Sequence, residues 1–198
     1  LVEPALDAFT HCLEALLNKN ANDVVYKYSL EGLKLSLRNL NLLYLPKPDY
    51  EVFKNAALIS LYGGISIFHN RTGIIHTLSV AISKYSEASH GLLNAQLLPF
   101  VLSINEPFYN GKMIELVRNI SNINHSSDKE ALIFISKWIK EFIHYKNFPT
   151  DLVSKNINKI LYRTLEDKGL QNVSHGIVDK KNLKELIIKM NNEIRQIQ

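Results

Sequence analysis

A chain of 198 residues, 46% of them hydrophobic, is long enough for one globular domain, or two small ones at most, and can bury a core without disulfide staples. The net charge of +4 comes from scattered basic residues without interleaved aromatic rings, which argues against a nucleic-acid-binding protein. No apolar run approaches the roughly 20 residues that cross a bilayer, and the single cysteine, Cys12, fits a reducing compartment such as the cytoplasm.

Apolar residues recur at helical spacing almost from end to end, and no segment shows the sustained alternation of a β-strand. Prolines, N-capping residues and polar stretches set the expected boundaries. Helices are expected from Pro4 to about Asn18, over 23–43, from Asp49 to about Phe68, around His76, from His90 to about Asn105 with a kink at Pro99, over 109–122, over 127–145, over 151–166, and after Asp179. The sequence predicts a single all-α domain over residues 1–198.

Four residues in two clusters are candidate metal ligands. Asp7 and His11 are four residues apart on the first predicted helix, a spacing that puts them on one helical face. His76 and His90 are fourteen apart and would lie about 20 Å from each other on one continuous helix, so a turn at 86–89 must bring them together. One carboxylate with three imidazoles suits iron or zinc. From spacing alone, a metal site and a set of ordinary helical histidines remain equally open.

Other polar residues are expected to have structural roles. Glu14, seven residues after Asp7, is expected to form a surface or buried pair rather than to take part in chemistry. Asn94, four residues after His90, could form a hydrogen bond near the site or serve helix packing. Three further histidines lie in polar loops or near helix ends and are expected to be solvated: His125, His144 and His175.

The segments LDAFTHCLEA, GIIHTLSVAI and SHGLLNAQLLPFVLSIN closely resemble signature segments of the iron-containing alcohol dehydrogenases. The resemblance continues to NFPTDL at 147–152 and to the last helix. It implies the helical C-terminal domain of the dehydroquinate synthase-like, iron-containing alcohol dehydrogenase fold. It also places Asp7, His11, His76 and His90 on the four metal ligands of the family, with Fe²⁺ or Zn²⁺ as the metal.

The resemblance implies an NAD(P)-dependent alcohol dehydrogenase, in which the metal acts as a Lewis acid on the alcohol oxygen during hydride transfer. The substrate would be a small-molecule alcohol or aldehyde, and a homo-oligomer is compatible with the family. One departure matters: Val80 stands where many members carry a histidine, four residues after the third ligand. Because valine cannot transfer a proton, the proton path or the substrate class must differ, and no catalytic residue beyond the ligands is assigned.

Family members bind NAD(P) through an N-terminal α/β half with a glycine-rich phosphate loop. The eight glycines of this chain include no G-x-G-x-x-G pattern after a strand. The nucleotide-binding domain is therefore expected to be absent from this chain, and the chain alone to be inactive. Two alternatives stay open: a helical binding or assembly module without activity of its own, and a metal-dependent lyase like the dehydroquinate synthases, whose ligand pattern includes a glutamate not seen here.

Overall fold

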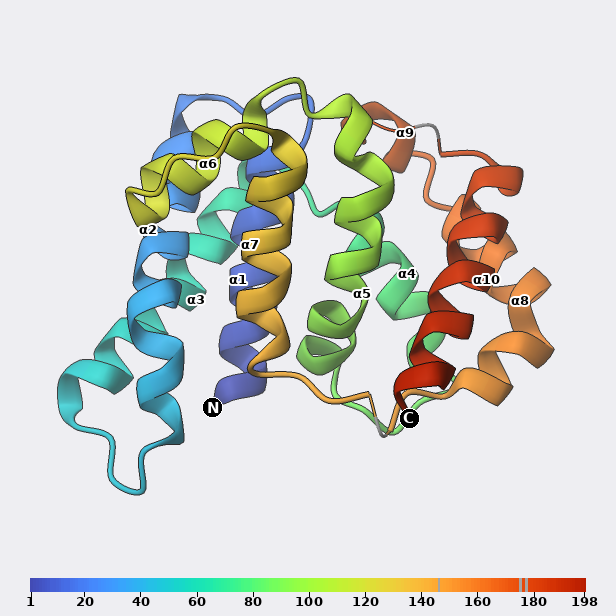
Figure 1. Cartoon of the computed structure of the whole chain (residues 1–198), viewed down its shortest axis with the longest axis horizontal. Helices are drawn as coiled ribbons and strands as arrows, with labels where there is room; N and C mark the ends of the chain where they lie inside the picture. The colour runs from blue at the N-terminus through green and yellow to red at the C-terminus, as the bar shows by residue number, and fades with distance from the viewer. Residues whose placement is uncertain (146, 175, 177) are drawn as a thin grey trace.

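The computed structural model describes residues 1–145, 147–174, 176 and 178–198, and within them it contains helices and no β-strand (Figure 1). The predicted all-α fold is confirmed. No helix in these ranges combines the length and apolar character needed to cross a membrane. The elements are α1 Val2–Leu17, α2 Asp23–Asn39, η1 Leu40–Tyr44, α3 Tyr50–Asn70, α4 Ile74–Ser83, α5 His90–Asn105, η2 Glu106–Phe108, α6 Lys112–Ser121, α7 Asp128–Lys140, α8 Thr150–Leu165, α9 Leu170–Val173 and α10 Lys180–Ile197.

Most helix starts follow the predicted capping residues. The side chains of Asp49 and Asp179 accept hydrogen bonds from backbone N–H groups in the first turns of α3 and α10. Ser127 caps α7 in the same way. Each cap satisfies a donor that has no partner inside the helix. Ser89 caps α5, which makes His90 the first residue of that helix.

Three elements differ from the sequence-based expectation, each near tertiary contacts that periodicity does not report. The helix expected over 23–43 ends at Asn39, whose side chain donates to the Val52 carbonyl of α3, and the chain continues as the 3₁₀ helix η1. The helix expected to reach Tyr145 ends at Lys140, and Gln96 of α5 donates to the His144 carbonyl just beyond it. The short helix α9 is not predicted, and the N–H group of Lys19 donates to the carbonyl of Val173 at its end. Helix α5 continues through Pro99, as expected.

Helix α1 runs through the centre of the molecule and packs against α2, α3 and α5 (Figure 1). Helix α4 packs against α5 and α8, and α10 packs against α8 and α5. The buried side chains of these helices form one continuous hydrophobic cluster, in which Phe9, Leu13 and Leu93 are fully buried. Along residues 5–17 of α1, only Asp7 and His11 are not buried. This largely buried helix therefore opens toward solvent on the face that carries the first two candidate ligands.

Candidate metal centre

Three helices bring the candidate ligands to one place. Asp7 and His11 lie on adjacent turns of α1, His76 lies in the first turn of α4, and His90 begins α5. Helix α4 ends at Ser83, and the chain turns before α5, which packs back against α4. The ring centroids of His76 and His90 are 5.4 Å apart. The predicted helix–turn–helix return is confirmed.

Asp7, His76 and His90 form the convergent part of the cluster. The Oδ1 atom of Asp7 lies 3.3 Å from Nε2 of His76 and 3.6 Å from Nε2 of His90. One possible ligand atom from each of these three residues lies within 4.8 Å of the other two. Since ligand bonds to zinc are about 2 Å long, atoms this close can share one ion.

His11 lies beside this group without joining it. Its Nε2 atom is 3.9 Å from Oδ2 of Asp7, and its ring stacks on the His76 ring with centroids 4.4 Å apart. The structure therefore brings three of the four predicted ligands to a common point and holds the fourth next to them. His11 would have to reorient its ring to act as a ligand.

His76 is more deeply buried than the other histidine of the convergent group, His90. Its side chain is 7% exposed, against 41% for His90. The Nε2 atom of His76 is buried and has no hydrogen-bond partner. An unsatisfied buried polar atom costs on the order of 1–3 kcal/mol, so it calls for an explanation such as an ion. The cluster thus offers a buried nitrogen that faces the Asp7 carboxylate without a well-formed hydrogen bond, and a second candidate ligand, His90, that is open to solvent.

Three neighbours hold the candidate ligands in place. Glu14 of α1 lies with Oε2 2.7 Å from Nδ1 of His76. The Asn94 amide donates to Asp7 Oδ1 at 2.7 Å, and its nitrogen is 3.1 Å from Nε2 of His90. Ser79 Oγ lies 3.1 Å from Nδ1 of His90. Partners of this kind set the orientation of metal ligands.

The expectation that Glu14 forms a pair is confirmed. The pair is buried, and the partner of Glu14 is the candidate metal ligand His76. Of the two roles left open for Asn94, the structure supports hydrogen bonding at the site. Sequence analysis did not identify Ser79, although its position three residues after His76 puts both on one face of α4.

The charges of the cluster are coupled. Burial lowers the pKa of His76, but the carboxylates of Asp7 and Glu14 outweigh burial and raise it to about 9. Burial and the neighbouring His76 lower the pKa of His11 to about 4. Burial raises the pKa of Asp7, yet its histidine and amide neighbours bring it below the usual value. Near neutral pH, a proton on His76 therefore lies between two carboxylates, at a place that attracts positive charge.

Two further histidines that the structure describes, His125 and His144, lie outside this cluster. His144 is exposed, as expected. His125 is only half-buried, but its Nε2 atom is enclosed without a partner, so the expectation that it is solvated was wrong for that atom. Its ring packs near Phe134 of α7, which accounts for the enclosure. His175 lies outside the described residues.

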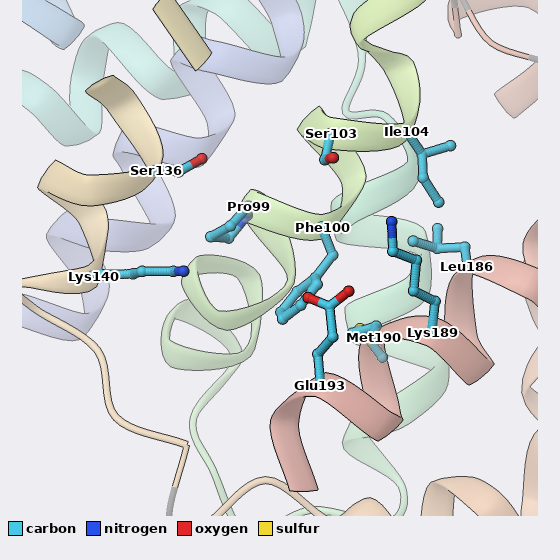
Figure 2. A pocket seen from close by; sticks show the side chains of 10 residues that line it. All are labelled: Pro99, Phe100, Ser103, Ile104, Ser136, Lys140, Leu186, Lys189, Met190 and Glu193. Atoms are coloured by element: carbon cyan, nitrogen blue, oxygen red, sulfur yellow. The ribbon is translucent and has the colours of Figure 1, made fainter. Parts of the chain in front are cut away.

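A separate cavity of about 170 Å³ lies between α5, α7 and α10 (Figure 2). Phe100 and Met190 line it, and the charged side chains of Lys189 and Glu193 reach toward it from α10. None of the four candidate ligands lines this cavity. The cavity in Figure 2 and the candidate metal ligands therefore lie in different parts of the molecule.

Comparison with known proteins gives a consistent result. Residues 1–192 match the family model described as the Fe-containing alcohol dehydrogenase family, C-terminal. The 1,3-propanediol dehydrogenase of Klebsiella pneumoniae is 30% identical over 100 residues, which cover 50% of this chain and 26% of that protein.

Two solved structures share the fold. The iron-containing alcohol dehydrogenase of Thermococcus thioreducens superposes with a TM-score of 0.80 at 21% identity, covering 95% of this chain and 49% of its own. The sulfoacetaldehyde reductase of Bifidobacterium kashiwanohense, solved in complex with NAD⁺, superposes with a TM-score of 0.76 at 16% identity, covering 96% of this chain and 50% of its own. The chain spans about half the length of these solved relatives.

Proposed function

The chain belongs to the iron-containing alcohol dehydrogenase family, matching its C-terminal part, and from this premise we propose that Asp7, His11, His76 and His90 hold one divalent metal ion. The observation that carries the proposal is the convergence of one possible ligand atom each from Asp7, His76 and His90, within 4.8 Å of one another, beside the buried Nε2 atom of His76. The donor set, a carboxylate oxygen with imidazole nitrogens, fits Fe²⁺ or Zn²⁺.

The residues of the chain have distinct parts in this site. When bound, the metal supplies a Lewis acid for the oxygen of a small alcohol or aldehyde. Asp7 contributes the negative charge among the ligands, and His76 anchors the site from the buried side. His90, with 41% of its side chain exposed, lies on the side from which a substrate can approach. Val80 is 47% exposed and has no proton to exchange, so proton transfer must use another group or water.

The hydride acceptor requires residues outside this chain. The sequence contains no glycine-rich phosphate loop after a strand, and the solved relatives are about twice as long. We therefore propose that NAD(P) is bound by a separate nucleotide-binding part of the working enzyme and that this chain alone is inactive. The match to the alcohol dehydrogenase family model favours this proposal over a dehydroquinate synthase-like lyase. The buried Cys12 thiol fits a protein that works in a reducing compartment, which we propose to be the cytoplasm.

The lack of that loop also favours a second proposal for the chain by itself, a helical module that binds metal or a partner without catalysis. Kinetics separate the two proposals. Metal-loaded chain, mixed with the nucleotide-binding part of a family member, should oxidise small alcohols with NAD⁺ only if the chain is a catalytic domain.

Metal content tests the shared core of both proposals. Purified chain, stripped with chelator and reloaded anaerobically with Fe²⁺ or Zn²⁺, should retain about one ion per chain after desalting. The double variant in which His76 and His90 are replaced by alanine should retain none. A wild-type chain that retains no ion would overturn the proposed metal site.

A further inference from the structure

Glu14 joins two helices of the metal cluster through one carboxylate. It lies on α1, one turn beyond His11, and its side chain is 7% exposed. Its oxygens accept hydrogen bonds from the backbone N–H groups of Gly73 at 2.9 Å and Ile75 at 2.7 Å. The N–H group of His76 also points to it at 3.4 Å. Glu14 therefore caps the N-terminus of α4, which has no capping side chain of its own.

The same carboxylate also contacts the ring of His76, with Oε2 2.7 Å from Nδ1. An ionised carboxylate has no proton to donate, so Nδ1 must carry the hydrogen in this contact. With Nδ1–H held by Glu14, the second proton of the ring sits on Nε2, the atom that faces Asp7 at 3.3 Å, and loss of that proton leaves a lone pair there. A histidine can bind a metal only through a nitrogen without a proton.

We infer that Glu14 is a positioning residue: by capping α4 and binding Nδ1 of His76, it fixes the height, rotation and tautomer of that ring so that Nε2 faces the metal position. This inference rests on the proposed metal site. In addition to Asp7, the Glu14 carboxylate then places a second negative charge near the metal position. It lies on the Nδ1 side of the His76 ring and would not contact the metal. The negative charge of Glu14 makes Nε2 of His76 a more basic metal ligand.

Gly73 provides the room for this arrangement. A Cβ atom at position 73 would lie 2.8 Å from Oε1 of Glu14 and 3.2 Å from Oδ1 of Asn18. Any larger residue would have to displace the carboxylate that caps α4. The pair of Gly73 and Glu14 therefore acts as one unit.

The chain contains a matched control for this role. Asp128 also caps a helix from outside: it accepts hydrogen bonds from Gly111 at 2.6 Å and from Met113 at 2.9 Å, at the N-terminus of α6. Helix α6, like α4, has a glycine at its N-cap position and no capping side chain of its own. Asp128 contacts no candidate ligand among its described hydrogen bonds. Loss of either carboxylate removes a cap, but only Glu14 contacts a ligand.

The test compares Glu14→Gln with Asp128→Asn. Glutamine keeps the size of Glu14. Its NH₂ group, however, must replace one of the two oxygens and so face a backbone N–H group, where no hydrogen bond can form. If that group faces Nδ1, it favours the tautomer with a proton on Nε2. We expect Glu14→Gln to weaken Zn²⁺ affinity about 10- to 100-fold, the range found for other partners of metal-ligating histidines. Asp128→Asn should stay well below this 10- to 100-fold range, because the described hydrogen bonds of Asp128 reach no candidate ligand.

Three measurements on the full chain decide the outcome. Competition with a chromophoric chelator gives the Zn²⁺ affinity, the visible spectrum of the Co²⁺-loaded chain reports the ligand geometry, and thermal unfolding without metal reports the cap. Equal losses of unfolding temperature in both variants, with an affinity loss and an altered Co²⁺ spectrum only in Glu14→Gln, support the inference. Equal Zn²⁺ affinities in the two variants would overturn it and leave Glu14 as a cap only.

A failure of the proposed metal site can be distinguished from a failure of the inference about Glu14. If the metal site is wrong, the wild-type chain itself binds no Zn²⁺, and both the site and the role of Glu14 are rejected. If Glu14→Gln does not fold, Gly73→Ala replaces it, since this variant keeps every polar group and crowds the Glu14 carboxylate most, with a smaller effect on Asn18. A folded Gly73→Ala chain with several-fold weaker Zn²⁺ affinity supports the inference, and one with wild-type affinity overturns it.

Discussion

The N-termini of α4 and α6 have similar capping but different consequences. Each begins after a glycine and is capped by a carboxylate from another helix, Glu14 for α4 and Asp128 for α6. At α6, the Asp128 carboxylate accepts hydrogen bonds from backbone N–H groups at a half-buried position. At α4 the capping carboxylate is buried and continues to the ring of His76. The comparison teaches that one stabilising device can serve the fold alone or the fold and the site together.

The glycines of the two caps differ in the same way. Gly111 has a φ of +88°, a left-handed conformation that favours glycine, and a Cβ atom there would meet open space. Gly73 has a φ of −113°, which any residue can adopt, but a Cβ atom there would lie 2.8 Å from Oε1 of Glu14. Gly111 is thus required by the backbone, and Gly73 by the carboxylate that reaches the site.

The largest effect should come from removing a ligand on the α4 and α5 side. His90→Ala should weaken Zn²⁺ affinity by well over the ~100-fold reached by residues that only support a ligand. Because 41% of the His90 side chain is exposed, the free energy of unfolding without metal should change little. Isothermal titration with Zn²⁺ and thermal unfolding in chelator measure the two quantities. Zinc affinity within tenfold of wild type would exclude His90 as a ligand.

The second largest effect is a pH dependence of stability without metal. The pKa of His76 is raised to about 9, against 6.5 for an ordinary histidine, so the folded state binds this proton more tightly than the unfolded state. The resulting stabilisation is fully present below pH 6.5 and is lost as pH rises through about 9. It amounts to something on the order of 3 kcal/mol. Denaturant unfolding in chelator, at steps from pH 6 to pH 9.5, measures the loss.

His11 should act in the opposite direction in a lower window. Its pKa is lowered to about 4, so the unfolded state binds the proton more tightly and stability should increase as pH rises from 4 to 6.5. Asp128→Asn should lower the whole profile without changing its shape, because this residue lies in the other capped region. A profile that is flat between pH 6.5 and 9 would contradict the account of His76.

A smaller effect is expected at the N-terminus of α6. Gly111→Ala should lower the free energy of unfolding by roughly 1–2 kcal/mol, the strain of a left-handed residue with a Cβ atom. Its Zn²⁺ affinity should remain that of wild type, since the strain does not reach the cluster. Chemical denaturation and chelator competition on the same sample check both statements. A metal affinity reduced in proportion to stability would show that the two regions are not independent.

The smallest effect should come from Ser79, which contacts the exposed ligand. Ser79→Ala removes the partner 3.1 Å from Nδ1 of His90, and Zn²⁺ affinity should decrease by roughly tenfold or less, at the lower end for such partners. Ser83→Ala, later on the same helix, is the matched control, because the Ser83 hydroxyl donates to the Val80 carbonyl of its own helix. Chelator competition should place Ser83→Ala at the wild-type affinity. An equal loss in both variants would point to a change in α4 itself.

The sequence predicted what depends on spacing and local capping. The i, i+4 spacing of Asp7 and His11, the helix start at His90 and the caps Asp49 and Asp179 all follow from local rules, and the structure has them. The resemblance to the family predicts the four ligands, and the structure brings three of them, Asp7, His76 and His90, to a common point. The sequence could not predict that His11 would stack on His76 outside the convergent group, because ring orientation depends on packing between α1 and α4.

Long-range partners were the other limit. Glu14 and Gly73 are 59 positions apart, and their contact exists only because α1 and the start of α4 meet in the folded chain. The early end of α2 at Asn39 likewise follows from a hydrogen bond to Val52 on α3. Periodicity reports which face of a helix is buried, but not which carboxylate will cap the next helix or which ring it will hold.

The most direct test of the account is a crystal of the chain grown with Zn²⁺, measured on both sides of the zinc absorption edge. The account predicts one strong anomalous peak within bonding distance of Asp7, His76 and His90, with the His11 ring turned toward it and Glu14 still bound to Nδ1 of His76. A peak elsewhere, or no peak with the cluster unchanged, would contradict the claim that these helices are built around a metal ion.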